Sequence, residues 1–281
     1  MTIPRIELND GTSIPQLGLG VFQVPPPETA RVVADALEAG YRHIDTAQMY
    51  GNEEGVGQAI ADSGLPRDDL YVTTKLNNGF HRPDDARRAF DDSLNKLGLD
   101  HVDLFLIHWP LPMLYDGDFV STWQTLVELK KEGRTTSVGV SNFQPDHLDR
   151  IVDATGVAPV VNQVECHPFF RNDSVRAANE RLGIVTEAWA PIAQGRVADD
   201  DTIGEIASLT RRTPAQVVLR WHLQHGHVVF PKTTRPERMR ENADLFDFEL
   251  SDDQMRAIDT LDRGEEGRQG AHPDTFDYVP D

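Results

Sequence analysis

Four side chains that can hold or move a proton follow three consecutive apolar segments in the first half of the chain. They are a carboxylate, a phenol, an ammonium group and an imidazole, contributed by Asp45, Tyr50, Lys75 and His108. A tyrosine with its ordinary pKa of about 10 is a poor acid at neutral pH, but a nearby ammonium group favours the phenolate and lowers that pKa. A carboxylate would hold the ammonium group in place. Together the four groups suit a general acid that protonates a carbonyl oxygen while hydride reaches the carbon, with the imidazole orienting the same oxygen and no metal required.

Each of these residues also has a purely structural interpretation. Asp45 is of a type that often caps a turn. Lys75 is typical of a solvated strand end, and His108 beside an apolar run is typical of a hydrogen-bonded core histidine. Only their joint occurrence after neighbouring segments favours a catalytic group.

The four residues can meet only if the apolar segments before them are strands of one sheet. Short apolar runs alternate with amphipathic stretches along the chain. We predict strands at 17–20, 41–44, 70–75, 102–107, 136–140, 160–164, 184–189 and 228–231. We predict helices at 28–39, 53–63, 84–97, 119–132, 145–154, 172–182, 200–225 with a break near Thr213-Pro214, 236–245 and 251–261. Asn9-Asp10-Gly11 is a turn signal that predicts a hairpin between 5–8 and 14–17, ahead of the main body.

Eight strands that alternate with helices predict an α/β fold of the (β/α)8 TIM barrel type, with residues 1–281 as a single domain. The alternative is an open doubly wound sheet, in which a glycine-rich phosphate turn follows the first strand. The segment from Gly18 to Gln23 lacks the third glycine of that pattern, and the chain has no P-loop. The barrel is therefore favoured, and its chemistry is expected at the carboxyl ends of the strands.

Polar or aromatic residues end or follow seven consecutive predicted strands, so they should converge on one mouth of the barrel. Besides the four residues above, they include Trp109, Ser141, Asn142, Gln163, Trp189, Lys232 and Thr233. The last two begin a basic cluster, in which four of the nine residues from 232 to 240 are basic. Lys232 and Arg238 can reach one phosphate group, and Thr233 adds a hydroxyl. The alternative is a solvated helix, which the like-charged pair Glu237 and Glu241 would not stabilise.

Composition narrows the class of protein. The 281 residues include 27 Lys and Arg against 46 Asp and Glu, a formal charge of −19, which argues against nucleic acid or an anionic membrane as partner. The first ten residues do not resemble a signal peptide, and no run of about 18 apolar residues occurs, so we expect a cytoplasmic protein.

Histidines and a cysteine leave a metal site to be considered. One cysteine, Cys166, excludes an internal disulfide and any multi-cysteine metal site, and we expect its thiol to be inert. The spacing of His222, His225 and His227 is compatible with metal ligands, but their place late in a helix and its turn favours a structural role. We predict no metal.

Several longer segments carry a further pattern. They are GYRHIDTAQMYGNE (40–53), TKL (74–76), LGLDHVDLFLIHWP (97–110), VGVSNF (138–143), VNQVECHP (161–168) and PKTTRPERMRENADLFDFEL (231–250). In this order they resemble the aldo-keto reductase superfamily over nearly the whole chain. TEAWAPIAQGR (186–196) is similar to the bacterial branch that contains 2,5-diketo-D-gluconate reductase.

The resemblance implies a barrel closed at its base by the hairpin, with an extra C-terminal helix and tail, and an NADPH-dependent carbonyl reductase. It implies that Tyr50 is the general acid, that Lys75 lowers its pKa, that Asp45 holds Lys75, and that His108 orients the substrate carbonyl. Ser141, Asn142 and Gln163 would bind the nicotinamide carboxamide, and Trp189 would stack on its ring. Lys232, Thr233 and Arg238 would hold the 2′-phosphate, with Glu241 and Asn242 near the adenine. Gly20, Val21 and Phe22 would line the cofactor and substrate mouth, with Trp109 beside the carbonyl.

The sequence departs from the family pattern at a few positions. Asn77 stands where an aromatic residue is common, Ala193 replaces a glycine of the cofactor loop, and Thr233 replaces a serine. The short polar tail after Arg263 predicts an open mouth suited to small dicarbonyl or keto-sugar-acid substrates.

Two other functions fit parts of the pattern. A Schiff-base lyase could use Lys75 as nucleophile, but it leaves the basic cluster and the amide residues without a role. A non-enzymatic NADPH-sensing barrel would need no intact acid–base set. We expect a monomer that acts on a small-molecule carbonyl.

Overall fold

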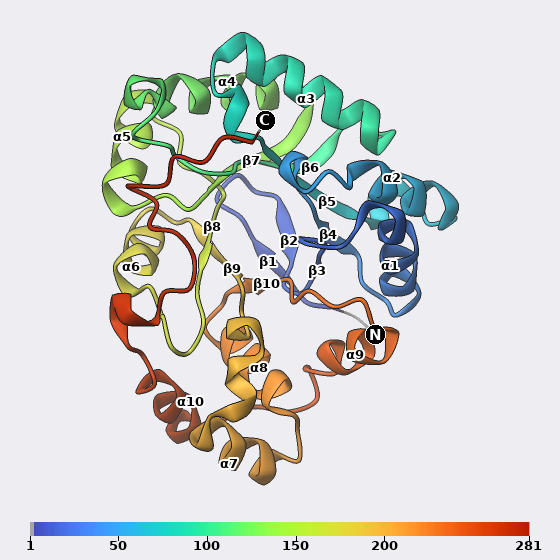
Figure 1. Cartoon of the computed structure of the whole chain (residues 1–281), viewed down its shortest axis with the longest axis vertical. Coiled ribbons are helices and arrows are strands. Elements are labelled where there is room, and N and C mark those ends of the chain that lie inside the picture. The colour runs from blue at the N-terminus through green and yellow to red at the C-terminus, as the bar shows by residue number, and fades with distance from the viewer. Residues whose placement is uncertain (1–2, 281) are drawn as a thin grey trace.

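A closed ring of parallel strands forms the centre of the molecule (Figure 1). The computed structural model describes residues 3–280, and within them one eight-stranded sheet follows chain order. Its strands are β3 (Leu19–Gly20), β4 (His43–Asp45), β5 (Tyr71–Leu76), β6 (Val102–Ile107), β7 (Thr135–Ser141), β8 (Val161–Glu165), β9 (Val185–Trp189) and β10 (Val228–Val229). The first and last strands meet through a parallel bridge between Leu17 and Val229, and the amide of Gly18 donates to the carbonyl of Val229 at 2.8 Å. The predicted barrel is confirmed.

Helices surround the ring and connect its strands (Figure 1). They are α1 (Pro26–Glu38), α2 (Glu53–Asp62), α3 (Pro83–Leu97), α4 (Phe119–Lys131), α5 (Pro145–Thr155), α6 (Asp173–Arg181), α7 (Asp201–Thr210), α8 (Pro214–Gln224), α9 (Pro236–Ala243) and α10 (Asp252–Asp259). Short 3-10 helices are η1 (Gln48–Tyr50), η2 (Arg67–Asp69), η3 (Asn78–Phe80), η4 (Tyr115–Gly117), η5 (Ala193–Asp199) and η6 (Gly264–Gly267).

The predicted break in the helical region 200–225 is confirmed, and its cause is local. Arg211 ends α7 in a left-handed conformation, at a φ of 57°. Thr213 then caps α8 by accepting from the amide of Gln216, and the side chain of Gln216 reaches back to the amide of Thr213. Pro214 fits the first helical position because that position needs no amide donor.

The hairpin closes the amino-terminal end of the barrel, as predicted. β1 (Arg5–Glu7) pairs with β2 (Ser13–Pro15), and both are labelled within the ring in Figure 1. Leu8 and Ile14 are buried in the same apolar cluster as Leu104 of β6. Asp10 in the turn ties the hairpin to the barrel, since its carboxylate lies 2.5 Å from the Lys130 ammonium group.

The C-terminal tail packs along the rim of the barrel, against the end of β8 and against Trp109. The carboxylate of Glu165, at the end of β8, accepts from the backbone amides of Gln269 and Gly270 at 2.6 and 2.8 Å. Further along, the ring of Phe276 lies 4.1 Å from that of Trp109. In Figure 1 the red tail leaves α10 and runs past α6 and α5. Two backbone amides and the ring of Phe276 therefore dock the tail on the barrel.

Candidate active site

The ammonium group of Lys75 lies at the centre of the candidate site. In the parallel register of β4 and β5, Asp45 lies opposite Thr73, and Lys75 is two residues further along on the same face. The Lys75 Nζ atom donates to Asp45 Oδ1 at 2.6 Å and to the Thr46 carbonyl at 2.9 Å. It also donates to the hydroxyl of Tyr50 at 3.3 Å. Three of the four predicted catalytic residues are therefore in direct contact.

Burial and charge set the protonation of this group. Burial by itself lowers the pKa of Lys75, but the charges and hydrogen bonds of Asp45 and Tyr50 together outweigh burial, so the pKa lies above its ordinary value and the ammonium group stays charged. For Tyr50 the effect of burial is the larger one, so the pKa of the phenol is raised although Lys75 acts in the opposite direction. Lys75 thus acts in the predicted direction, but burial, which the sequence did not show, makes the net shift of the Tyr50 pKa upward. The phenol is protonated at neutral pH, as a general acid must be.

His108 is the fourth predicted residue, and it lies edge-on to the phenol. The rings of Tyr50 and His108 have centroids 5.7 Å apart, and Phe22 lies 5.0 Å from Tyr50 on another side. Burial, helped by the charge of Lys75, places the pKa of His108 well below its ordinary value, so the imidazole is neutral. Its Nδ1 atom is buried and has no hydrogen-bond partner within residues 3–280.

A second group of side chains connects the ends of β7, β8 and β9. Asn142 adopts the left-handed conformation, with a φ of 64°, and its amide nitrogen donates to the His108 carbonyl at 3.0 Å. Its amide oxygen accepts from the Trp189 indole at 2.9 Å. The Ser141 hydroxyl donates to the backbone carbonyl of Gln163 at 2.8 Å. Sequence reasoning placed Ser141, Asn142, Gln163 and Trp189 at the mouth, and the structure brings them together there with His108.

Sequence reasoning missed Glu187. The amide nitrogen of Gln163 donates to Asp45 Oδ2 at 2.9 Å and also to Glu187 Oε2 at 3.0 Å. Glu187 is completely buried on β9, and burial, together with Asp45, raises its pKa to about 8. The signal was present as a lone glutamate inside the apolar run of the predicted strand 184–189.

The basic cluster lies where β10 leads into α9. Lys232, Arg235, Arg238 and Arg240 are exposed, and in the described part of the chain none of them lies within salt-bridge distance of a carboxylate. By contrast, Arg212 pairs with two aspartates. Free cations beside the buried Thr233 hydroxyl and the amino end of a helix are the donor set that a phosphate group requires.

The other residues predicted to line the cofactor site either bind a neighbouring helix or are buried. The carboxylate of Glu241 accepts from the Thr213 hydroxyl at 2.8 Å, which ties α9 to the start of α8. Asn242 is buried. Gly20 and Val21 are buried at the end of β3, where a Cβ atom on Gly20 would come within 2.8 Å of the Phe230 carbonyl. Glycine at this position lets β3 and β10 approach closely.

The sequence profile of the Aldo/keto reductase family matches residues 15–263. The chain belongs to the aldo/keto reductase family. It is 49% identical over 276 residues to an aldo-keto reductase of Mycolicibacterium smegmatis, covering 98% of this chain and 99% of that one. It is 47% identical over 273 residues to the methylglyoxal reductase DkgA of Escherichia coli, covering 96% and 97%. A crystal structure of a Gox0644 variant in complex with NADPH has a TM-score of 0.94 at 48% identity, covering 99% and 100%.

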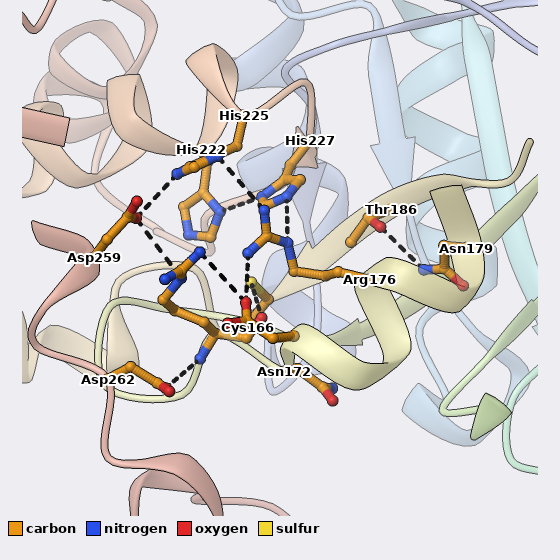
Figure 2. A network of polar contacts seen from close by, with 12 residues as sticks. Cys166, Asn172, Arg176, Asn179, Thr186, His222, His225, His227, Asp259 and Asp262 are labelled. Atoms are coloured by element: carbon orange, nitrogen blue, oxygen red, sulfur yellow. Dashed lines mark hydrogen bonds and ion pairs between the residues drawn. The ribbon is translucent and has the colours of Figure 1, made fainter. Parts of the chain in front are cut away.

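This aldo/keto reductase also contains a network of polar contacts around Arg176 (Figure 2). Arg176 Nε donates to His227 Nε2 at 3.1 Å, so the proton of His227 is on Nδ1. That proton points at His222 Nδ1, 3.0 Å away, and His222 Nε2 in turn donates to the Pro191 carbonyl at 3.0 Å. Burial lowers the pKa of His222 to about 3, in agreement with a neutral ring.

The same network contains three described residues, Cys166, His222 and His227, whose side chains could together hold a metal ion. The ligand atoms of Cys166, His222 and His227 lie within 4.8 Å of one another. Both histidines already have a hydrogen-bond partner at each ring nitrogen, and a cation would lie beside the Arg176 guanidinium. Burial raises the pKa of Cys166 to about 12, so the thiol is protonated. The contacts therefore favour the structural interpretation.

Within residues 3–280 no helix is both long and apolar enough to cross a membrane.

Proposed function

We propose that this reductase acts as a monomer on small dicarbonyl or keto-sugar-acid substrates, with Tyr50 as the general acid. The observation that carries the proposal is the contact of the Tyr50 hydroxyl with an ammonium group, at 3.3 Å from Lys75 Nζ. That ammonium group is fully buried and paired with Asp45. The substrate class follows DkgA, a relative named as a methylglyoxal reductase.

The enzyme uses NADPH, which supplies the hydride when bound. The residues present suit this cofactor. Lys232, Thr233 and Arg238 offer a phosphate group cations without acidic partners and a hydroxyl group. Asn142 and Gln163 offer amide groups at the ends of neighbouring strands, and Trp189 offers an indole ring whose nitrogen is held by Asn142.

We infer a separate task for each catalytic residue. Tyr50 donates its hydroxyl proton to the substrate oxygen, and the Lys75 ammonium group stabilises the phenolate that remains. Asp45 keeps Lys75 in place and charged. The neutral imidazole of His108 donates a hydrogen bond to the substrate oxygen. The ring of Phe22 packs beside that of Tyr50, and the ring of Trp109 packs against that of the tail residue Phe276.

The lyase alternative conflicts with the state of Lys75. A Schiff-base nucleophile must be an uncharged amine, whereas Asp45 and Tyr50 hold the pKa of Lys75 above its ordinary value. The NADPH-sensing alternative gives no function to the four acid–base residues Asp45, Tyr50, Lys75 and His108. The contacts of Lys75 therefore favour reduction over both.

A panel of carbonyl compounds tests the proposal. NADPH oxidation is followed by absorbance with methylglyoxal, 2,5-diketo-D-gluconate and a bulky steroid ketone, and the molar mass is measured by light scattering. We expect kcat/KM to be highest for the small dicarbonyls, and a molar mass of one chain. A strong preference for the steroid would overturn the substrate class. Inactivation by borohydride with substrate, without NADPH oxidation, would support the lyase instead.

A further inference from the structure

Glu187 is a buried titratable group to which the mechanism above assigns no task. It is on β9, opposite Gln163 of β8 in the parallel register, with Val228 of β10 on its other side. Its side chain points into the barrel, where it shares one amide nitrogen with Asp45. The other carboxylate oxygen, Oε1, is buried and has no hydrogen-bond partner within residues 3–280.

This sharing determines which end of the Gln163 amide faces the mouth. Asp45 is ionised through its pair with Lys75, so it requires a donor, and the amide nitrogen must face it. Both amide hydrogens are then used, one on Asp45 and one on Glu187. The amide oxygen of Gln163 is left as an acceptor, which is what an NH2 group of a bound carboxamide needs.

Charge balance inside the barrel makes Glu187 sensitive to a further charge. The ionisable groups that face it are Asp45 of β4, and Lys75 and Tyr71 of β5, while Val228 on β10 is apolar. The Lys75 cation is already balanced by Asp45, so an ionised Glu187 would be a second carboxylate with no cation of its own. The pKa of Glu187 is therefore raised to about 8, and its carboxyl group is mostly protonated at neutral pH.

We propose that Glu187 is a positioning residue that orients Gln163, and that it releases its proton to solvent when oxidised cofactor binds in place of reduced cofactor. This rests on the proposed function. The nicotinamide ring is neutral in NADPH and carries a positive charge in NADP+. A positive ring held by Gln163 attracts the ionised form of Glu187, so the O–H bond of the carboxyl group breaks more readily and its proton leaves to the buffer. By linkage, raising the pH strengthens NADP+ binding relative to NADPH binding.

The ratio of the two dissociation constants is the direct measurement. Both forms of the cofactor carry the same phosphates and adenine, so their titration cancels in the ratio Kd(NADPH)/Kd(NADP+). We expect this ratio to rise by about fivefold between pH 7 and pH 9, the lower end of typical coupling between two sites. Calorimetry in buffers of different ionisation enthalpy should show that NADP+ binding near pH 8 releases more protons than NADPH binding does.

Three variants separate this role from a merely structural one. Glu187→Gln keeps an acceptor for Gln163 but cannot ionise, so Kd(NADPH) at pH 7 should stay near that of the wild type while the pH slope of the ratio disappears. Glu187→Leu removes the acceptor and should weaken both cofactor forms by about fivefold, the effect of losing one hydrogen bond. Glu53→Gln is the matched control, because Glu53 is a buried carboxyl that contacts Thr74 and not Gln163. It should keep the slope.

The outcomes distinguish this inference from the proposed function. A wild-type enzyme that oxidises NADPH with carbonyl substrates, but whose pH slope survives in Glu187→Gln, overturns the inference alone. Equal cofactor affinity in Glu187→Leu and the wild type overturns the positioning role. A wild-type protein that neither binds nor oxidises NADPH overturns the proposed function, and the inference with it.

Discussion

Replacing Lys75 by methionine should lower both stability and activity, because both depend on the buried ion pair of Lys75 with Asp45. The side chains of Lys75 and Asp45 are 0% and 3% exposed. Removing the ammonium group leaves a buried carboxylate without its cation, which costs about 3–5 kcal/mol. In a protein of this size 1 kcal/mol shifts Tm by about 2–4 °C, so Lys75→Met should melt about 10 °C below the wild type. Turnover should fall about 100-fold or more, because Tyr50 loses the cation that stabilises its phenolate.

A double variant separates the two losses. In Asp45→Asn with Lys75→Met both charges are absent, so most of the lost Tm should return, while turnover stays as low as in Lys75→Met alone. Melting is followed by circular dichroism and turnover by NADPH absorbance with methylglyoxal. A single variant that melts like the wild type would show that the pair is not a buried charge pair. Turnover within a few-fold of the wild type would refute the role of Lys75.

Three further substitutions test other parts of the account. Arg238→Ala should raise KM for NADPH by about tenfold or more, as the loss of a charge-assisted contact does, and should change KM for NADH little; equal losses would remove Arg238 from the phosphate site. Glu165→Gln weakens the carboxylate that accepts from the amides of Gln269 and Gly270, so hydrogen exchange of those amides should quicken, and unchanged exchange would contradict the docking of the tail. Ala193→Gly relieves a left-handed residue, at a φ of 48°, and should raise the free energy of unfolding by about 0.5–1 kcal/mol; a lower value in denaturant titration would show that burial of the Ala193 methyl group outweighs the strain.

The barrel and the site could be predicted because their signals lie in side-chain types. Most residues of the barrel strands are buried, several of the strands are apolar runs in the sequence, and polar residues mark the points where strands end. Asp45, Tyr50 and Lys75 were therefore placed correctly from their positions after consecutive strands, and their contacts follow from the parallel register.

The parts that were missed depend on three-dimensional contacts. The tail docks partly through backbone amides, which every sequence contains, and partly through the single ring of Phe276, so its mainly polar composition did not predict these contacts. Glu187 is a single polar residue in an apolar strand, and only the closure of the barrel brings it to Gln163. The sign of the Tyr50 pKa shift depended on how far burial opposes the charge of Lys75, which no spacing of residues can show.

The central claim is that the Tyr50 hydroxyl delivers the proton, and Tyr50→Phe tests it most directly. The phenyl ring keeps the packing against Phe22 and His108 and lacks only the hydroxyl. The measurement is single-turnover oxidation of enzyme-bound NADPH by methylglyoxal, with cofactor affinity determined on the same sample. We expect a rate about 10²–10⁴-fold below the wild type and an unchanged Kd for NADPH. A rate near that of the wild type would contradict it.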